Sequence, residues 1–270
     1  MKELTALQKI ERSIHKKFRR EIWRKFISGV QKYEMIQAND KIAICISGGK
    51  DSMLMAKLMQ QLHRHSDVPF ELIFLVMNPG YNKENFLKIK SNAEFLKIPI
   101  TVFDSDIFEI VSKEKKSPCY LCARMRRGFL YANAQKLGCN KIALGHHMSD
   151  VVETTLMGML YGAQFQTMMP KLKSRNFPGM ELIRPMYCVE EAAILAWKNY
   201  NRLSFIQCAC PLSSGENEST REAVKKLIEN LKKENKDIEK SVFKSLHMLN
   251  LDTAIGYKLN EVEHSFLDGY

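Results

Sequence analysis

Long hydrophobic runs are missing from this sequence. Its apolar stretches, such as Ile42 to Ile46 and Leu72 to Met77, are far shorter than the roughly 20 residues that a membrane-spanning helix needs. The first residues are charged and amphipathic, so they do not resemble the apolar centre of a signal peptide. Since nothing indicates membrane insertion or secretion, we expect a cytoplasmic protein without a membrane partner.

Acidic residues are scarce relative to basic ones. The chain has 30 Asp and Glu against 41 Lys and Arg, which gives a formal net charge of +11. Residues 1–36 hold ten basic and four acidic residues, whereas residues 213–270 hold nine basic and eleven acidic ones. The basic excess therefore lies in the N-terminal part and around the middle, as a polyanion-binding surface would require. A solvated basic face would give the same distribution, so charge alone does not choose between them.

Repeats, low-complexity tracts and proline-rich linkers are also absent. The 270 residues are 45% apolar, which is enough for a proper core. Short apolar runs alternate with segments of helical spacing, and this alternation predicts an α/β fold with a doubly wound parallel sheet. The expected strands are 41–46, 70–77, 100–103 and 141–144, with helices between them and a further helix at about 150–161.

Segments of different character flank this alternating region. Residues 4–36 have apolar side chains at helical spacing and many basic ones, which predicts basic amphipathic helices. Turn residues at 174–179 separate two apolar stretches and suggest a hairpin. We therefore expect a basic helical extension at 1–37, an α/β domain at 38–212 and a helical C-terminal tail at 213–270.

A glycine-rich turn, Ser47-Gly48-Gly49-Lys50-Asp51-Ser52, follows the first expected strand and opens a helix. We call residues 47–52 the phosphate loop, because helix N-termini at the carboxyl ends of parallel strands bind anions. The two glycines allow a tight turn and close backbone approach, the serines supply hydroxyl donors, and Lys50 supplies charge. Asp51 would repel phosphate unless it holds a cation such as Mg²⁺ or caps the turn.

The phosphate loop is neither a Walker A sequence nor Gly-x-Gly-x-x-Gly. It resembles the PP-loop motif Ser-Gly-Gly-x-Asp-Ser of the N-type ATP pyrophosphatases, and an ordinary Gly-Ser turn is the alternative. Residues 118–128 and 145–150, with 169–172 and 183–185, are similar to one branch, the tRNA 2-thiocytidine synthetase family (TtcA). The similarity runs from about residue 36 to 211. It implies an adenine nucleotide alpha hydrolase-like fold and conversion of the cytidine at tRNA position 32 to 2-thiocytidine with ATP, Mg²⁺ and a [4Fe–4S] cluster.

The Cys-x-x-Cys pair at Cys119 and Cys122 is ambiguous on spacing alone, since it suits a redox dithiol, half a zinc site or a cluster site. The family resemblance implies that these two and Cys208 hold the cluster, which leaves one iron open for hydrosulfide. The later group, Cys208-Ala209-Cys210, departs from the Cys-x-x-Cys of typical members, so a four-cysteine zinc site with Cys210 stays open. Core or incidental roles are expected for the other thiols, which are Cys45, Cys139 and Cys188.

The resemblance also suggests the remaining site residues. Core packing, helix capping or a solvated helix surface are the alternatives for the residues outside the phosphate loop. The candidate ATP and pyrophosphate ligands are Ser47, Gly48, Gly49, Lys50, Asp51, Ser52, Met77, Gly145, His146 and Asp150, of which Lys50, Asp51 and Ser52 are the candidate catalytic residues, and either His146 or its neighbour His147 could face the nucleotide. The candidate tRNA contacts are Arg124, Arg126, Arg127 and Lys171.

The reaction that this resemblance implies has an activating half and a sulfur-transfer half. The cytosine O2 attacks the α-phosphorus of ATP, pyrophosphate leaves, and sulfur then replaces AMP at C2. The expected partners are tRNA, a sulfur donor such as a cysteine desulfurase, and a second copy of the chain in a homodimer. The alternatives are a PP-loop ligase or amidotransferase without a cluster, a related enzyme that adenylates another substrate, and a non-catalytic metal- or RNA-binding module.

Overall fold

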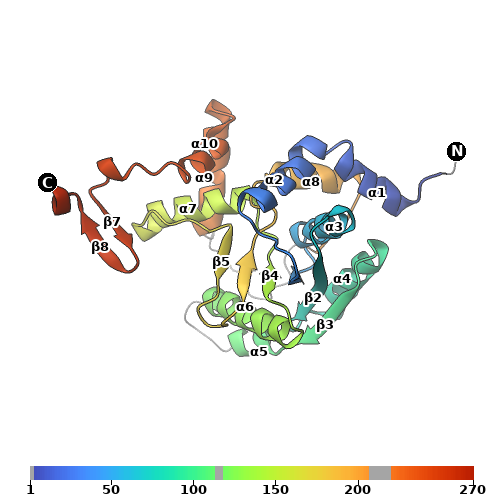
Figure 1. The fold of residues 1–270 in the computed structure, drawn as a ribbon. Coiled ribbons are helices and arrows are strands. Elements are labelled where there is room, and N and C mark those ends of the chain that lie inside the picture. Colours follow the sequence, from blue (N-terminus) through green and yellow to red (C-terminus); the bar gives the residue numbers. More distant parts are fainter. Residues whose placement is uncertain (1–2, 113–117, 207–219) are drawn as a thin grey trace. The chain divides into compact units, whose positions relative to one another are not determined.

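The computed structural model describes residues 3–112, 118–206 and 220–270. Its described residues contain a six-stranded sheet of order β3-β2-β1-β4-β6-β5 (Figure 1). All neighbours pair in parallel except β5, which is antiparallel to β6. The chain leaves β1 on one side toward β2 and returns on the other to β4, so the topological switch point lies at the carboxyl end of β1. The strands are β1 (Asp40–Ile46), β2 (Phe70–Asn78), β3 (Ile100–Asp104), β4 (Lys141–Ala143), β5 (Lys171–Lys173) and β6 (Glu181–Ile183).

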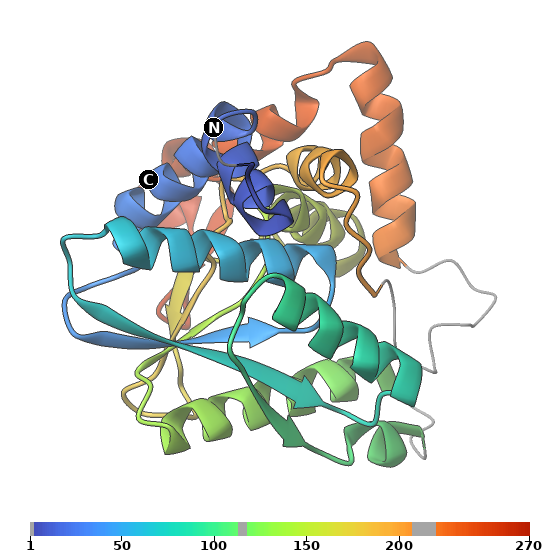
Figure 2. The ribbon, with the colours of Figure 1, turned by 90° about the vertical axis from the view of Figure 1, so that its right-hand side faces the viewer.

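Helices cover both faces of this sheet. The β1–α3–β2 and β2–α4–β3 connections step in one direction, so right-handed crossovers put α3 (Lys50–His65) and α4 (Lys83–Phe95) on the same face. The return from β3 to β4 puts α6 (Pro118–Lys136) on the opposite face (Figure 2). Tyr131 and Ala134 of α6 pack there against Ala43 and Cys45 of β1. The predicted doubly wound α/β fold and the hairpin at β5 and β6 are therefore confirmed.

The N-terminal helices belong to the same compact unit as the sheet. They are α1 (Ala6–His15), a π-helical turn η1 (Arg19–Trp23) and α2 (Arg24–Lys32). Their apolar positions Ile14, Ile22 and Phe26 are fully buried, as the helical spacing predicts. An ion pair attaches α1 to α3, because the fully buried Lys57 places its Nζ 2.7 Å from Oε1 of Glu11.

The chain divides into two compact units, Met1–Val151 with Met168–Glu218, and Val152–Thr167 with Ser219–Tyr270. In the second unit, Val152 packs with Val224 and Ile228, and Arg221 Nε donates to Glu153 Oε2 at 2.8 Å. No helix in the described part of the chain is both long and apolar enough to cross a bilayer. The remaining elements are α5 (Ile107–Ser112), α7 (Met148–Gly162), α8 (Glu191–Tyr200), α9 (Thr220–Glu234), α10 (Ile238–Ser245), η2 (Leu251–Thr253), β7 (Gly256–Leu259), β8 (Val262–Ser265) and η3 (Phe266–Gly269).

Candidate functional site

The phosphate loop joins β1 to α3 at the switch point. Gly48 has a φ of +86°, and a Cβ there would lie 2.4 Å from Cγ1 of Ile89 and 2.9 Å from Cδ1 of Ile206. Only glycine fits this position, on both conformational and steric grounds. The hydroxyl of Ser52 donates to the carbonyl of Gly49 at 3.0 Å and accepts from the amide of Ser47 at 3.2 Å. These bonds fix the turn at the N-terminus of α3, and the unpaired first amides of a helix are what an anion site requires.

Gly145 brings the connection after β4 against the phosphate loop. A Cβ on Gly145 would lie 3.1 Å from the backbone nitrogen of Ser52 and 3.2 Å from the carbonyl carbon of Asp51. Backbone therefore meets backbone at this point, with no space for a side chain. The close approach carries residues 145–150 to the same edge of the sheet as the phosphate loop.

Lys50 lies between two carboxylates. Its Nζ is 3.1 Å from Oδ2 of Asp51 and 2.9 Å from Oε1 of Glu191, the first residue of α8. Burial lowers the pKa of Lys50, but these two carboxylates outweigh burial and raise the pKa above its ordinary value. Lys50 is therefore a fixed ammonium ion at the phosphate loop, held by residues from two helices.

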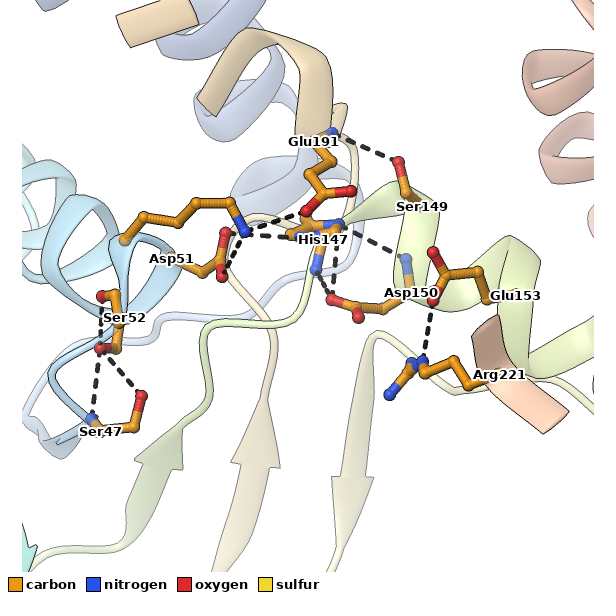
Figure 3. Close-up of polar contacts among 11 residues, drawn as sticks. Ser47, Asp51, Ser52, His147, Ser149, Asp150, Glu153, Glu191 and Arg221 are labelled. Atoms are coloured by element: carbon orange, nitrogen blue, oxygen red, sulfur yellow. Dashed lines mark hydrogen bonds and ion pairs between the residues drawn. The ribbon is translucent and has the colours of Figure 1, made fainter. Parts of the chain in front are cut away.

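His147 occupies the space between Asp51 and Asp150 (Figure 3). Its Nε2 is 3.6 Å from Oδ1 of Asp51, and its Nδ1 is 3.4 Å from Oδ2 of Asp150. Asp150 also accepts a hydrogen bond from the backbone amide of His147 at 3.0 Å. Of the two candidate histidines, His147 is the one that reaches Asp51, and His146 instead accepts a hydrogen bond from Nε of Arg184 at 3.3 Å.

Asp51 carries a buried carboxylate oxygen, Oδ1, that has no hydrogen-bond partner among the described residues. A buried carboxylate oxygen without a donor costs free energy unless a cation completes its environment. Mg²⁺ prefers such hard oxygen ligands and keeps several waters of its own. The carboxylate of Asp51 thus has the chemistry that a Mg²⁺ ligand needs.

Met77 and Cys122 pack together behind this edge of the sheet. Both are buried in one apolar cluster with Ile107, Phe108 and Val111. Met77 lies near the carboxyl end of β2, so this cluster contacts the edge that carries the phosphate loop. The candidate nucleotide residue and one candidate cluster ligand therefore belong to the same apolar cluster.

The cluster ligands are described in part. Cys119 precedes Cys122 by three residues in α6, a spacing that puts both on one helix face, but the side chain of Cys119 lies outside the described part. Cys208 and Cys210 lie outside the described residues altogether. Among the residues that are described, no group of three or more His, Cys, Asp or Glu forms a metal site. The buried Cys122 thiol in apolar surroundings, on a Cys-x-x-Cys helix, fits an iron–sulfur ligand.

Of the other described cysteines, Cys45 and Cys139 are buried and Cys188 is partly buried. Burial raises the pKa of Cys45 to about 12 and that of Cys139 to about 11, and both pack in the core beside α6. Cys188 also has a pKa above its ordinary value, chiefly because of burial. The surroundings of Cys45 and Cys139 are those of core residues, one of the two kinds of role, core or incidental, expected for these thiols.

The candidate tRNA contacts lie on two elements. Arg124 and Arg127 of α6 are exposed, and Arg126 is half-buried. Lys171 of β5 donates from Nζ to the carbonyl of Glu34 at 3.2 Å. Arg184 is nearly buried and donates to the carbonyl of Met169, and burial lowers its pKa to about 10. Arg184 thus joins the ring of His146 to the backbone at Met169, whereas Arg124 and Arg127 of α6 are exposed.

Glu191 was not identified from the sequence, and neither was helix α8 that carries it. A helix signal was present, since Glu190 and Glu191 precede the helix-forming run Ala192-Ala193-Ile194-Leu195-Ala196. Acidic residues in a first helical turn are common, so this signal predicts a helix but no partner. Only the fold shows that Glu191 pairs with Lys50.

The PP-loop domain family matches residues 14–231 of the chain. The tRNA-cytidine(32) 2-sulfurtransferase of Geobacter sulfurreducens is 34% identical over 227 residues, which cover 80% of this chain and 85% of the relative. The enzyme of the same name from Photobacterium profundum is 32% identical over 261 residues, 94% of this chain and 83% of the relative.

Solved structures with a similar fold include a tRNA-modifying enzyme. The U34-tRNA thiolase NcsA from Methanococcus maripaludis, solved with its [4Fe-4S] cluster, superposes with a TM-score of 0.67 at 21% identity, over 84% of this chain and 79% of that one. At this identity the likeness concerns the fold alone. The family predicted from the phosphate loop and its neighbouring motifs is confirmed by the sequence relatives: the chain belongs to the tRNA-cytidine(32) 2-sulfurtransferase family of PP-loop proteins.

Proposed function

We propose that this protein is an ATP-dependent tRNA sulfurtransferase that replaces the C2 oxygen of cytidine 32 with sulfur. The proposal rests on membership of a family whose relatives are named for that reaction. The single structural observation that carries it is the phosphate loop at the N-terminus of α3, with a fixed Lys50 and a buried Asp51 oxygen that accepts no hydrogen bond from the described residues. This arrangement suits a nucleoside triphosphate with its Mg²⁺ ion.

The phosphate loop performs the activating half of the reaction. Amides at Gly48 and Gly49 bind the β- and γ-phosphates, and the hydroxyl of Ser52 joins them by exchanging its bond to the Gly49 carbonyl for one to phosphate. Lys50 stabilises the negative charge that develops on departing pyrophosphate. The target oxygen attacks the α-phosphorus, and this adenylation turns a poor leaving group into AMP. The loop thus supplies charge stabilisation and positioning, and it needs no covalent chemistry of its own.

Asp51 is the proposed Mg²⁺ ligand, and His147 is the proposed group that orients it. Mg²⁺ would neutralise charge on the phosphates of ATP. Asp150 in turn fixes His147 through its contacts with the ring and the backbone amide. Met77 and Gly145 border the nucleotide from the ends of β2 and β4.

The sulfur-transfer half is assigned to Cys119, Cys122 and Cys208. A [4Fe–4S] cluster on three cysteines would supply one open iron for the incoming sulfur. Cys122 is buried in the same apolar cluster as Met77, and Ile206, two residues before Cys208, lies against Gly48. These neighbours support a sulfur-delivery site next to the phosphate loop. Exposed Arg124 and Arg127 would hold the tRNA backbone there, a cysteine desulfurase would supply the sulfur, and the working form would be a homodimer.

The proposal is tested with protein purified without oxygen, ATP, Mg²⁺, sulfide and unmodified tRNA. We expect iron and sulfide in the protein, and release of AMP and pyrophosphate only when unmodified tRNA is present. Cys119→Ala should abolish thiolation. Undiminished release of AMP and pyrophosphate by Cys119→Ala would instead favour a PP-loop ligase without a cluster. Absence of AMP release with any RNA would favour a non-catalytic module.

A further inference from the structure

A groove runs along the N-terminal helices, in a region to which the proposed reaction assigns no role. It has a volume of about 380 Å³ and lies where η1 passes into α2. Most of its lining side chains are exposed, so it is an open channel that suits part of a long ligand better than an enclosed small molecule. The lining residues are Arg19, Trp23, Arg24, Ile27, Ser28, Gln31 and Lys32.

The cations of this groove are not neutralised by the protein. Within the part of the chain that is described, Arg19, Arg24 and Lys32 form no salt bridge, whereas the neighbouring Lys25 pairs with Glu190. Residues 19–32 contain five basic residues and one acid, the exposed Glu21. The groove therefore carries a local positive charge that an anionic ligand would satisfy.

The π-helical turn shapes the groove. The amide of Phe18 donates to the carbonyl of Ser13 at 2.9 Å, and the amide of Trp23 donates to the carbonyl of Phe18 at 3.3 Å. Each donor follows its acceptor by five residues, which is the π-helical pattern. Such widened turns often occur at functional sites. Trp23 is held by ring contacts with His15, at 4.4 Å between centroids, and with Phe26, at 5.7 Å. A half-buried, fixed indole thus lies among the cations.

The spacing of the cations indicates a polymer. Lys32 follows Arg24 by eight residues, which is about 12 Å along a helix and too far for one phosphate group. Arginine and lysine beside an aromatic ring are the usual elements of single-stranded nucleic acid binding. A membrane surface fits less well, because the apolar face of these helices, including Ile22 and Phe26, is already buried in the protein.

We propose that this groove binds a stretch of RNA backbone, with Trp23 as a contact surface for a sugar or base. The identification of that RNA as the substrate tRNA rests on the function proposed above. The groove then acts as a docking site that adds affinity without touching the reacting atoms.

The test compares Arg19→Ala/Arg24→Ala with the control Lys233→Ala/Lys236→Ala, which removes two exposed charges from the second unit. Binding of an unmodified tRNA transcript is measured at several salt concentrations. We expect the groove variant to bind about tenfold more weakly and the slope of log K against log salt to fall by about 1.4, as for two lost phosphate contacts to a single strand. The control should match the parent protein.

Kinetics separates this inference from the proposed function. For thiolation, the groove variant should raise KM for tRNA and leave kcat unchanged. If the parent protein thiolates no tRNA but the groove variant still binds RNA more weakly, the RNA-binding role of the groove is supported and the sulfurtransferase function is rejected. Parental RNA affinity and salt slope in the groove variant would overturn the inference. Binding to vesicles of anionic lipid is measured as well, and a groove variant that loses binding to these vesicles but not to tRNA would also overturn it.

Discussion

Lys50 and Glu191 form an ion pair, with 2.9 Å between Nζ and Oε1, that joins the start of α3 to the start of α8. The pair connects the phosphate loop to a helix that follows it by more than a hundred residues. Because Lys50 is also the proposed phosphate ligand, Glu191 would compete with bound phosphate for the same ammonium group.

Glu191→Gln keeps the shape of the side chain and removes its charge. We expect ATP with Mg²⁺ to bind roughly three- to tenfold more tightly, because Lys50 no longer has to exchange one anion for another. Titration calorimetry measures this change. Glu190→Gln is the matched control, since Glu190 pairs with Lys25 and should leave ATP affinity unchanged. Weaker ATP binding by Glu191→Gln would mean that Glu191 supports the nucleotide.

Gly145→Ala tests the close approach of backbone to the phosphate loop. The added methyl group would lie 3.1 Å from the nitrogen of Ser52, so the loop must shift and its amides lose their alignment. We expect at least about a tenfold loss of ATP affinity, which is about 1.4 kcal/mol. Gly128→Ala in α6 meets no atom within 4 Å and should bind ATP normally. Equal ATP affinity in both variants would remove Gly145 from the site.

Asp51→Asn tests the proposed Mg²⁺ ligand. The amide is isosteric with the carboxylate but binds Mg²⁺ weakly, so the Mg²⁺ concentration for half-maximal AMP release should rise at least about tenfold. Asp237→Asn, which alters an exposed carboxylate paired with Lys240, serves as the control. An unchanged Mg²⁺ requirement in Asp51→Asn would show that this oxygen does not hold the ion.

Thiol reactivity tests the burial of the core cysteines. With a pKa of about 12, Cys45 is about one part in 10⁴ thiolate at pH 8, and only the thiolate reacts with iodoacetamide. Peptide mass spectrometry should therefore find Cys45 and Cys139 unmodified in the native protein and fully modified after unfolding in guanidinium. The thiolate fraction rises tenfold per pH unit below the pKa, so any native labelling should increase toward alkaline pH. Labelling at pH 8 as fast as in the unfolded chain would contradict the structure.

Local sequence was sufficient for the phosphate loop and most of the sheet. An apolar run, a glycine turn and a helical pattern act through neighbouring residues, and β1, the turn at Gly48 and α3 follow from them directly. The β5–β6 hairpin was likewise visible in its turn residues. Strands of a parallel sheet are covered by helices on both faces, so they appear in the sequence as short, nearly continuous apolar runs.

Long-range pairing was not visible in the sequence. Nothing near Glu191 specifies Lys50 as its partner, and nothing in the pair His146-His147 says which ring reaches Asp51. Both depend on how the β4–α7 connection and α8 meet the phosphate loop in three dimensions. The hairpin of β7 and β8 was also missed, since most of its side chains are exposed and no alternating buried face marks it.

The most direct measurement of the central claim is nucleoside analysis of tRNA after incubation with the anaerobic protein, ATP, Mg²⁺ and sulfide. Mass spectrometry of digested tRNA should detect 2-thiocytidine at position 32, formed one-for-one with AMP, and none with Asp51→Ala/Ser52→Ala. Thionucleoside in equal amount from that double variant would contradict the role of the phosphate loop. AMP release without 2-thiocytidine would contradict the assigned nucleoside.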